Sequence, residues 1–396
     1  MAARFLLPAL ALAGSAVAAT CSGTTTITNQ AQATQLSSCQ QWTGDIVIAG
    51  SAAGEIDLNG LQRIDGSLIA KNIGKLTTFT ADSLSTISDT FQMIDVTALT
   101  TLTFPSLVAV DTINWQGLSS LQGLQFTQSV QKATNVQIVN TQLSSLDGID
   151  LNEAAILILA DNTFLNSVNM KLTNVTNALG FANNGPQLEI SLPNLKAANN
   201  VAFRNVSSVS IPSLSQVTGS LGFYSSYFTT LSAANLSTVA MTLAVVGNPH
   251  LTSASFPLLT AVGGGVQIAN NTALTNVDGF KKLSKVFGAV DMFGTFTSVA
   301  LPALNYVKGA FYLLSSGDLG NSCTRFDSLH SSSAIRGSYE CQGGQAGAST
   351  KGGSDGNSTS GGSSSSSSSG HSGATSLIIP YTTGFIGVVA AIFGML

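Results

Sequence analysis

One short motif recurs at nearly regular intervals through most of the chain and sets narrow limits on its fold. The segments FPSLVAVDTINW (104–115) and FPLLTAVGGGVQI (256–268) both open on an apolar-Pro-x-Leu-x-x-Val motif, which leads into a short alternating apolar run. A period of roughly 20–29 residues is typical of leucine-rich repeats and β-solenoids, in which each repeat buries its apolar face only against its neighbours. The chain is therefore predicted to be a stack of similar coils.

The leucine of the motif anchors each coil, and successive anchors are almost evenly spaced along the chain. The anchors are Leu61, Leu84, Leu107, Val130, Leu151, Leu172, Leu195, Leu214, Leu236, Leu259, Leu283 and Leu304, with the weakest fit at Val130 and Leu151. After the turn, pairs such as Val266 and Ile268 flank one other residue, which places both members on the inner face of a strand. The pattern predicts a mainly β, right-handed parallel β-solenoid of the leucine-rich-repeat type, with about twelve coils and a length of roughly 55–60 Å.

Asparagine recurs just after the inner strand, at Asn72, Asn140, Asn162, Asn183, Asn205, Asn248 and Asn270. A buried asparagine at a solenoid corner can hydrogen-bond the backbone of adjacent coils, because its amide is both a donor and an acceptor. We interpret these asparagines as structural.

The residue between the two inward positions of each strand is expected to point outward. The predicted outer row is Ile69, Gln92, Asn114, Gln137, Leu157, Gly180, Ala202, Gly222, Ala244, Gln267, Asp291 and Tyr312. Its middle would expose nearly bare backbone, against which an extended polymer or a second protein could lie. Small residues that are merely tolerated on an exposed sheet explain the same pattern. The row has only one aromatic ring, on Tyr312, which argues against a sugar platform.

The four cysteines allow three disulfide connectivities, and their positions favour one of them. Cys21 and Cys39 precede the repeats, Cys323 and Cys341 lie near their end, and the two pairs have the same spacing along the chain. Disulfides Cys21–Cys39 and Cys323–Cys341 would close the two solenoid ends in an oxidising compartment. In the chain-entropy model, a loop of this size contributes about 3 kcal/mol.

Both termini carry targeting features. Residues 1–19 combine one basic residue, an apolar run and a small-residue cleavage pattern, which predicts a signal peptide. Residues 377–396 form an uncharged apolar tail after a Ser/Gly-rich stalk (346–376), which is expected to be disordered. A transmembrane anchor is normally followed by Lys or Arg on its cytoplasmic side, and this tail is not. We therefore predict that the tail is a GPI signal, which is removed. The predicted attachment residue is Ser368, with Gly373 as the alternative, and residues 20–345 form the solenoid.

Only 9% of the 396 residues are charged and the net charge is −4, so the composition does not favour nucleic-acid binding. Solubility must come from polar side chains and attached sugars. Asn-x-Ser/Thr motifs predict N-glycosylation at Asn174, Asn205, Asn235, Asn270 and Asn357.

No constellation of catalytic residues is evident. Hydrolases built on β-helices use paired carboxylates, yet the sequence between Ile190 and Val277 contains no Asp or Glu. The recurring Asp65, Asp89 and Asp111 are interpreted as turn residues. The three histidines are isolated and have no metal-ligand spacing, so no metal, cofactor or enzymatic activity is predicted.

The order of these features resembles that of the fungal GPI-anchored cell-wall organisation proteins of the extracellular-mutant type and the related sporulation-specific surface proteins. Their repeats are similar to the receptor L domain of growth-factor receptors. The resemblance covers nearly the whole chain and rests on the order of the features, because no single motif is decisive. It brings no catalytic residues with it.

The resemblance implies a non-catalytic surface glycoprotein needed for wall integrity and morphogenesis, in the outer leaflet of the plasma membrane, in the wall, or in both. The GPI lipid would attach the protein to the membrane. Wall glucan is a candidate partner, bound covalently or non-covalently. The alternative is a surface binding module that recognises a wall glycan or a protein. The sequence identifies no protein partner.

Overall fold

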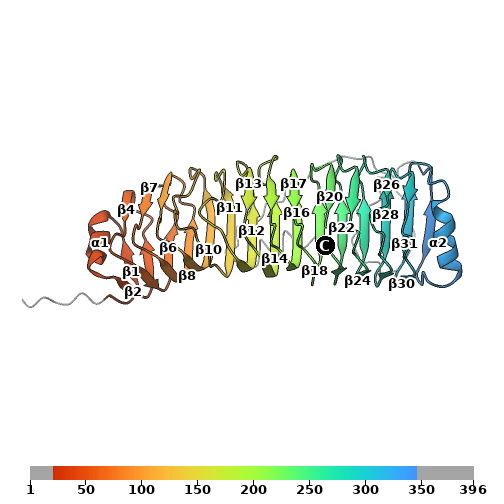
Figure 1. Ribbon diagram of the computed structural model, residues 1–396. Helices are drawn as coiled ribbons and strands as arrows, with labels where there is room; N and C mark the ends of the chain where they lie inside the picture. The colour runs from red at the N-terminus through yellow and green to blue at the C-terminus, as the bar shows by residue number, and fades with distance from the viewer. Residues whose placement is uncertain (1–20, 346–396) are drawn as a thin grey trace, which may run out of the picture.

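The computed structural model describes residues 21–345, which form a long rod of stacked coils (Figure 1). The rod is a parallel β-solenoid of about 13 turns, which confirms the predicted fold class. The number of turns exceeds the predicted twelve coils, because strand pairing extends before Leu61 and after Leu304. Short helices lie at the two ends: α1 (Gln30–Gln35) with the 3₁₀ turn η1 (Leu36–Ser38), and α2 (Ser322–Ser331).

One wall of the rod is a sheet of 22 strands within the described residues, and every pairing in it is parallel. The strands are β1 (Thr25–Ile27), β2 (Gln41–Thr43), β3 (Ile46–Ile48), β5 (Arg63–Asp65), β6 (Leu68–Lys71), β8 (Thr86–Ile94), β10 (Ala109–Leu118), β11 (Asn135–Thr141), β12 (Glu153–Ala160), β14 (Asn174–Ala182), β16 (Ala197–Arg204), β18 (Gln216–Val217), β19 (Leu221–Tyr224), β21 (Thr238–Val239), β22 (Leu243–Val246), β24 (Ala261–Val262), β25 (Val266–Ala269), β27 (Lys285–Val286), β28 (Val290–Gly294), β30 (Tyr306–Val307), β31 (Phe311–Ser315) and β32 (Tyr339–Gln342).

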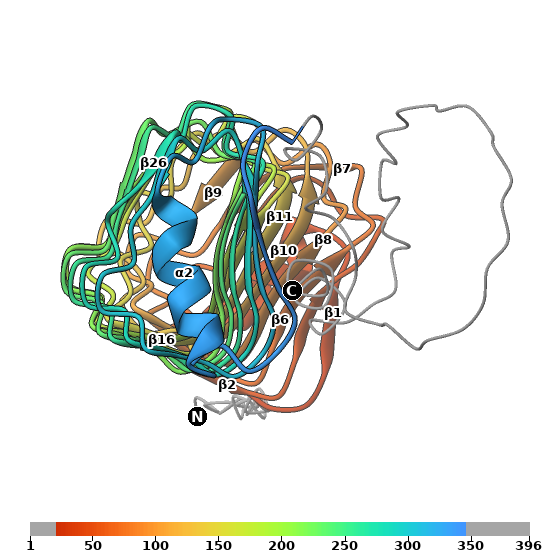
Figure 2. The same ribbon diagram turned by 90° about the vertical axis from the view of Figure 1, so that its right-hand side faces the viewer.

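The remaining strands form four small parallel sheets elsewhere on the coil. They are β4 (Ala53–Asp57), β7 (Lys75–Thr80) and β9 (Thr101–Thr103); β13 (Ser167–Asn169), β15 (Glu189–Ser191) and β17 (Ser208–Ser210); β20 (Thr230–Ser232) and β23 (Ser253–Ser255); and β26 (Asn276–Val277) and β29 (Ser298–Val299). Seen from the end of the rod, the chain runs around a central interior, and α2 lies across it (Figure 2).

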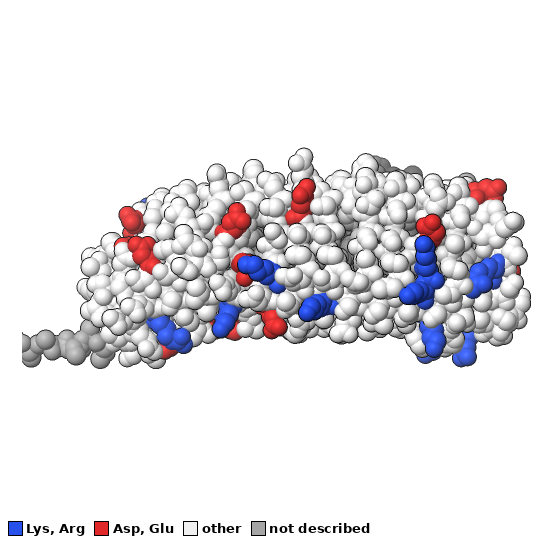
Figure 3. Space-filling model, viewed as in Figure 1, with Lys and Arg blue, Asp and Glu red and all other residues white. Residues whose placement is uncertain are grey.

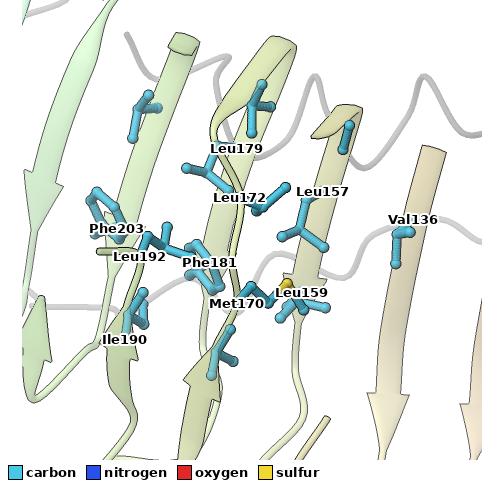
Figure 4. Packing of buried hydrophobic residues seen from close by; sticks show 14 of the residues in the cluster. Val136, Leu157, Leu159, Met170, Leu172, Leu179, Phe181, Ile190, Leu192 and Phe203 are labelled. Atoms are coloured by element: carbon cyan, nitrogen blue, oxygen red, sulfur yellow. The ribbon is translucent and has the colours of Figure 1, made fainter. Parts of the chain in front are cut away.

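The interior is one continuous hydrophobic core along the rod. All twelve anchors are at most 1% exposed, because each points into the coil and is covered by the coils on both sides. Figure 4 shows the same packing in the middle of the rod, where Leu157, Leu179 and Phe181 meet residues of the neighbouring coils. Phe203 stacks between Phe181 and Phe223, with ring centroids 5.6 and 5.3 Å apart.

Both ends of the core are closed by a helix and a disulfide. The pairs Cys21–Cys39 and Cys323–Cys341 are formed, as predicted. At the C-terminal end, Phe326 of α2 is fully buried, and its ring centroid lies 4.7 Å from that of Phe311 in β31. Without these caps, the apolar faces of the terminal coils would be open to water.

Polar residues at one corner divide into two rows that the sequence did not separate. Five of the seven recurrent asparagines have a left-handed backbone, and aspartate, serine or glycine takes that place in other coils. The φ angle lies between 48° and 68° at all of these positions, which are Asn72, Asp95, Gly117, Asn140, Asp161, Asn183, Asn205, Ser225, Gly247 and Asn270. Asparagine and glycine tolerate this conformation best. These five asparagines were predicted to be buried and to hydrogen-bond the backbone of adjacent coils. That prediction is corrected, because their role is to form a left-handed backbone turn.

The amide ladder is formed by Asn162, Asn184, Asn248 and Asn271, all of them buried. In each of its two halves, the second asparagine accepts hydrogen bonds from the backbone and side chain of the first. Asn184 Oδ1 does so at 3.1 and 3.0 Å from Asn162, and Asn271 Oδ1 at 2.9 and 3.0 Å from Asn248. The prediction of buried, backbone-bonding asparagine is correct for Asn162 and Asn248. Within residues 21–345, no helix is long and apolar enough to cross a bilayer.

Candidate functional site

The main sheet bends where each coil passes from its first short strand to its second. Five strands, β8, β10, β12, β14 and β16, cross this bend without a break. The pairing of neighbouring strands shifts register there, between Val110 and Thr112 in β10, between Ala154 and Ile156 in β12 and between Val175 and Ala178 in β14. A β-bulge bends its strand locally and re-aims the side chains beside it. The bulges coincide with a surface groove at this bend.

The groove has a volume of about 730 Å³ and crosses coils from β5 to β14. Hydroxyl and amide groups dominate its polar lining: Thr86, Ser88, Gln131, Thr134, Asn152, Thr173, Asn174 and Thr176. Thr86 and Asn174 each begin a strand whose next residue, Ile87 or Val175, is buried, so their own side chains point away from the core. Sequence reasoning missed this groove. The recurrence of Thr and Asn just before the inward strands was its only signal.

A second hollow of about 500 Å³ lies next to the groove on the outer face of the sheet. Its lining includes Thr112, Asn135 and Ile156, each of which directly follows a residue of the first groove. Gln92 and Asn114, on the predicted outer row, also line it. The two hollows adjoin around the bend and form one surface of mixed polar and apolar area. We call it the polar groove, after the hydroxyl and amide side chains that could bind a ligand there.

Charges in the polar groove are balanced in sign: Arg63 and Lys132 face Asp111 and Glu153. Arg63 pairs with Asp65 beside it. Asp111 accepts a hydrogen bond of 2.6 Å from the Thr134 hydroxyl of the next coil. This arrangement is suited to a neutral, hydrogen-bonding ligand.

The recurrent aspartates are tied into the coil stack. Besides Asp111, Asp89 accepts a hydrogen bond from the Ser67 hydroxyl at 3.0 Å, across neighbouring coils. Asp65 is paired with Arg63. All three aspartates lie in strands, β5, β8 and β10, so the interpretation as turn residues is corrected: they are strand residues whose carboxylates hold neighbouring side chains. Within residues 21–345, no group of three or more His, Cys, Asp or Glu side chains is arranged to hold a metal ion.

The register confirms that eleven of the twelve residues of the predicted outer row share one face of the sheet, and it shows that Leu157 does not. The expected exposure of the middle of the row is wrong, because Gln137, Ala202 and Ala244 are at most 1% exposed. Leu157 is fully buried in the core, and Ile158 takes the outer place between Gln137 and Gly180. The segment Ile156–Leu159 is apolar at every position, so alternation alone could not assign its faces.

The small residues of the outer row are not bare backbone throughout. A Cβ placed on Gly222 would lie 2.1 Å from the Tyr224 ring, so this ring folds back across the row. The Arg204 guanidinium lies 4.0 Å from the centroid of that ring. Burial raises the pKa of Tyr224 to about 12, against an opposing effect of Arg204. The row thus carries a second aromatic ring that the sequence pattern did not reveal.

The predicted modification sites are distributed around the rod. Asn174 begins β14 in the polar groove, and Asn235 is exposed on a turn. Asn205 and Asn270 occupy left-handed corners at φ 55° and 58°. Asn357, Ser368 and Gly373 lie outside the described residues, as do the predicted signal peptide, stalk and tail.

Comparison with known proteins identifies the family. A model of Ecm33, the GPI-anchored cell wall organization protein, matches residues 1–37. A cell surface GPI-anchored protein of Arthroderma benhamiae is 40% identical over 86% of this chain and 87% of its own length. Protein ecm33 of Aspergillus fumigatus is 41% identical over 88% and 87%, respectively.

A more distant relative is sporulation-specific protein 2 of Saccharomyces cerevisiae, which is 32% identical over 77% of this chain and 61% of its own length. No solved structure matches the chain. The extent and identity of the matches show that this chain belongs to the Ecm33 family of GPI-anchored cell wall organization proteins.

Proposed function

We propose that the protein organises the fungal cell wall without catalysing a reaction, by binding a neutral wall polysaccharide in the polar groove while a GPI lipid holds its C-terminal end at the membrane. The observation that carries the proposal is the groove itself, which crosses several coils and is lined by hydroxyl and amide groups. An extended polymer can follow such a surface from coil to coil, because the same chemistry recurs at the coil spacing of about 4.8 Å.

The ligand class follows from the lining. Threonine, serine, asparagine and glutamine offer donors and acceptors that match sugar hydroxyls. The charged side chains are balanced, two of each sign, so the groove does not favour a polyanion or a polycation. We therefore expect a neutral glucan or a related wall glycan.

The carboxylates support a non-catalytic role. Burial raises the pKa of Asp161 and of Asp291, which makes them the natural candidates for acid or base chemistry. The register places six coil steps between Ile158, near Asp161, and Asp291, a distance of about 29 Å. Paired carboxylates of glycosidases lie only roughly 5–10 Å apart.

The processing of the chain is part of the proposal. Residues 1–19 act as the signal peptide, 20–345 as the solenoid, 346–376 as the stalk and 377–396 as the removed tail. The lipid is attached at Ser368, with Gly373 as the alternative. Asparagine-linked sugars at Asn205, Asn235, Asn270 and Asn357 compensate for the low content of charged residues. A sugar on Asn174, the fifth predicted position, would lie in the polar groove, so polysaccharide binding requires that this site is unmodified.

The test uses mature protein from which a phospholipase has removed the lipid. Its binding to immobilised glucan, mannan and chitin oligosaccharides is measured for the natural chain, for Ala155→Trp and for Ala300→Trp. Ala155 lines the groove, whereas Ala300 is exposed elsewhere on the rod. We expect Ala155→Trp to weaken glycan binding at least tenfold, a loss of about 1.4 kcal/mol, and Ala300→Trp to leave it unchanged.

Two results would overturn the proposal. The first is a natural protein that binds none of these neutral glycans. The second is an Ala155→Trp variant that folds, binds glycan as the natural protein does and restores wall integrity in a strain lacking the gene. Circular dichroism of each variant confirms that the solenoid is intact.

A further inference from the structure

Basic and aromatic side chains gather on the last coils of the rod. We define the C-terminal basic patch as Lys285, Phe287, Tyr306, Lys308 and Arg336. All but Tyr306 are exposed, and 46% of the Phe287 surface is accessible to solvent. A large exposed aromatic surrounded by cations differs from the rest of this rod, whose apolar residues are mostly buried.

The patch is held in place by the coil register. Lys285 is the pairing partner of Tyr306 in the adjacent coil. The Lys308 N–H donates to Val286 O, and the Arg336 N–H donates to Val307 O, so Phe287, Lys308 and Arg336 lie on three successive coils. Because the backbone of each coil is bonded to the next, the spacing of these side chains is fixed.

Contacts within the patch join its aromatic and basic members. The Phe287 and Tyr306 rings have centroids 5.6 Å apart, and the Arg336 guanidinium lies 4.9 Å from the Tyr306 centroid. Both ion pairs found within residues 21–345 lie elsewhere, at Arg63 and Lys171. The three cations of the patch therefore have no carboxylate partner in the described chain and remain available to an anion.

Basic residues are unevenly distributed along the chain, and the stretch that carries the patch also contains Asp278, Asp291, Asp318, Asp327 and Glu340. No Lys or Arg occurs between Arg204 and Lys281, and then six follow between Lys281 and Arg336. No acidic residue occurs within 280–290 or 303–310. In Figure 3, several Lys and Arg side chains lie close together at the C-terminal end of the rod, near α2, with Asp or Glu above them, and other Lys and Arg are spread along the rest of the rod.

We propose that the C-terminal basic patch docks onto the phosphate-bearing headgroups of the membrane to which the protein is tethered. Cations attract anionic headgroups, and aromatic rings with a polar neighbourhood favour the membrane–water interface. Docking would lay the last coils of the solenoid against the bilayer and fix the direction in which the rod enters the wall. This inference uses the GPI tether but not the polysaccharide groove.

The position of the patch in the chain favours a membrane over a free anion. Gln345 is the last described residue, and Ser368 is the predicted lipid-bearing residue. Even fully extended, the segment between them spans no more than about 80 Å. The tether therefore keeps the patch at a high effective concentration near headgroups, so that weak contacts suffice for docking.

The experiment measures co-sedimentation of lipid-free mature protein with vesicles of phosphatidylcholine, with and without phosphatidylinositol. The test variant combines Lys285→Gln, Lys308→Gln and Arg336→Gln. At roughly 1 kcal/mol per basic residue near an anionic surface, the triple variant should bind anionic vesicles about 100-fold more weakly. Binding of the natural protein should also fall as salt rises.

The matched control combines Lys71→Gln, Lys75→Gln and Lys196→Gln, three exposed lysines far from the patch with the same change in charge. It should keep most of the vesicle binding. The inference fails if the natural protein ignores phosphatidylinositol, if the control loses as much binding as the test variant, or if soluble phosphorylated mannan is bound while anionic vesicles are not. None of these outcomes depends on glycan binding in the polar groove, which is measured separately.

Discussion

The asparagines Asn183 and Asn184 are neighbours in the chain with opposite roles, and they offer a sharp test of how the solenoid is stabilised. Asn184 is buried, its Nδ2 donates to Leu159 O at 2.9 Å, and its Oδ1 accepts from the backbone and side chain of Asn162. Asn183 is exposed, with φ 52°. We expect Asn184→Ala to destabilise the middle of the rod and Asn183→Gly to be nearly neutral.

The magnitude follows from the groups that would be left without partners. Asn184→Ala removes the acceptor of the Asn162 backbone N–H and of one Asn162 amide N–H, both in a residue only 1% exposed. Each of the two orphaned buried groups costs about 1–3 kcal/mol, so the expected loss is roughly 2–6 kcal/mol. Asn183→Gly removes side-chain hydrogen bonds to Asn205 and Asp161 and relieves a left-handed conformation, so its effect stays within about 0.5 kcal/mol.

The assay is urea denaturation followed by circular dichroism, with hydrogen exchange of β12 and β14 as the local measurement. A third variant, Asn184→Asp, places a carboxyl group in the same buried site. Burial raises the folded-state pKa of that carboxyl above its unfolded value near 4, so the variant should lose stability as pH rises from the unfolded to the folded pKa. The reasoning is refuted if Asn184→Ala costs less than about 1 kcal/mol, the lower bound for one orphaned group, or if Asn183→Gly costs as much.

Three further predictions concern other parts of the rod. Replacing Cys323 and Cys341 by serine should speed hydrogen exchange in β31 and β32, because a disulfide of this loop size contributes about 3 kcal/mol. The central coils should stay protected, because each coil couples mainly to its neighbours. A uniform loss of protection would contradict the capping role. In the Gly222→Ala variant, the added methyl group should push the Tyr224 ring off the sheet and lower the pKa of Tyr224 from about 12 towards 10 in an absorbance titration. The natural protein should lose stability as pH rises from 10 through 12, because the folded-state pKa of Tyr224 is raised. An unchanged titration in the variant would count against the observed packing. Peptide mapping after endoglycosidase treatment should find higher glycan occupancy at the exposed Asn235 than at the half-buried Asn174, Asn205 and Asn270, and an unmodified Asn235 would disprove this.

The sequence predicted the core well because a solenoid is close to one-dimensional. Each coil meets only its neighbours, so a residue that recurs at the repeat period, such as Leu107 or Leu259, has the same environment in every coil. The disulfides followed from the same property, since a stack has two ends and the cysteines are grouped there. The buried anchors and the pairs Cys21–Cys39 and Cys323–Cys341 in the structure match these predictions.

The errors arose where local register decides the outcome. A wholly apolar run such as Ile156–Leu159 has no alternation from which to assign faces, and β12 also shifts register at Ala154. The ladder asparagines were misplaced by one residue at Asn183 and Asn270. Both members of the pairs Asn183–Asn184 and Asn270–Asn271 can bond backbone, and only the left-handed φ of the first member turns the second inward.

The periodic sequence by itself determined the coil, its inward residues and its closed ends, because these depend on contacts that repeat along one axis. The tertiary structure alone decided the polar groove and the C-terminal basic patch. Both join residues from different coils, Thr134 with Asp111 in the groove and Arg336 with Tyr306 in the patch. Such neighbours arise from the exact stacking of coils and from bulges that re-aim side chains, and neither is written in the spacing of any single repeat.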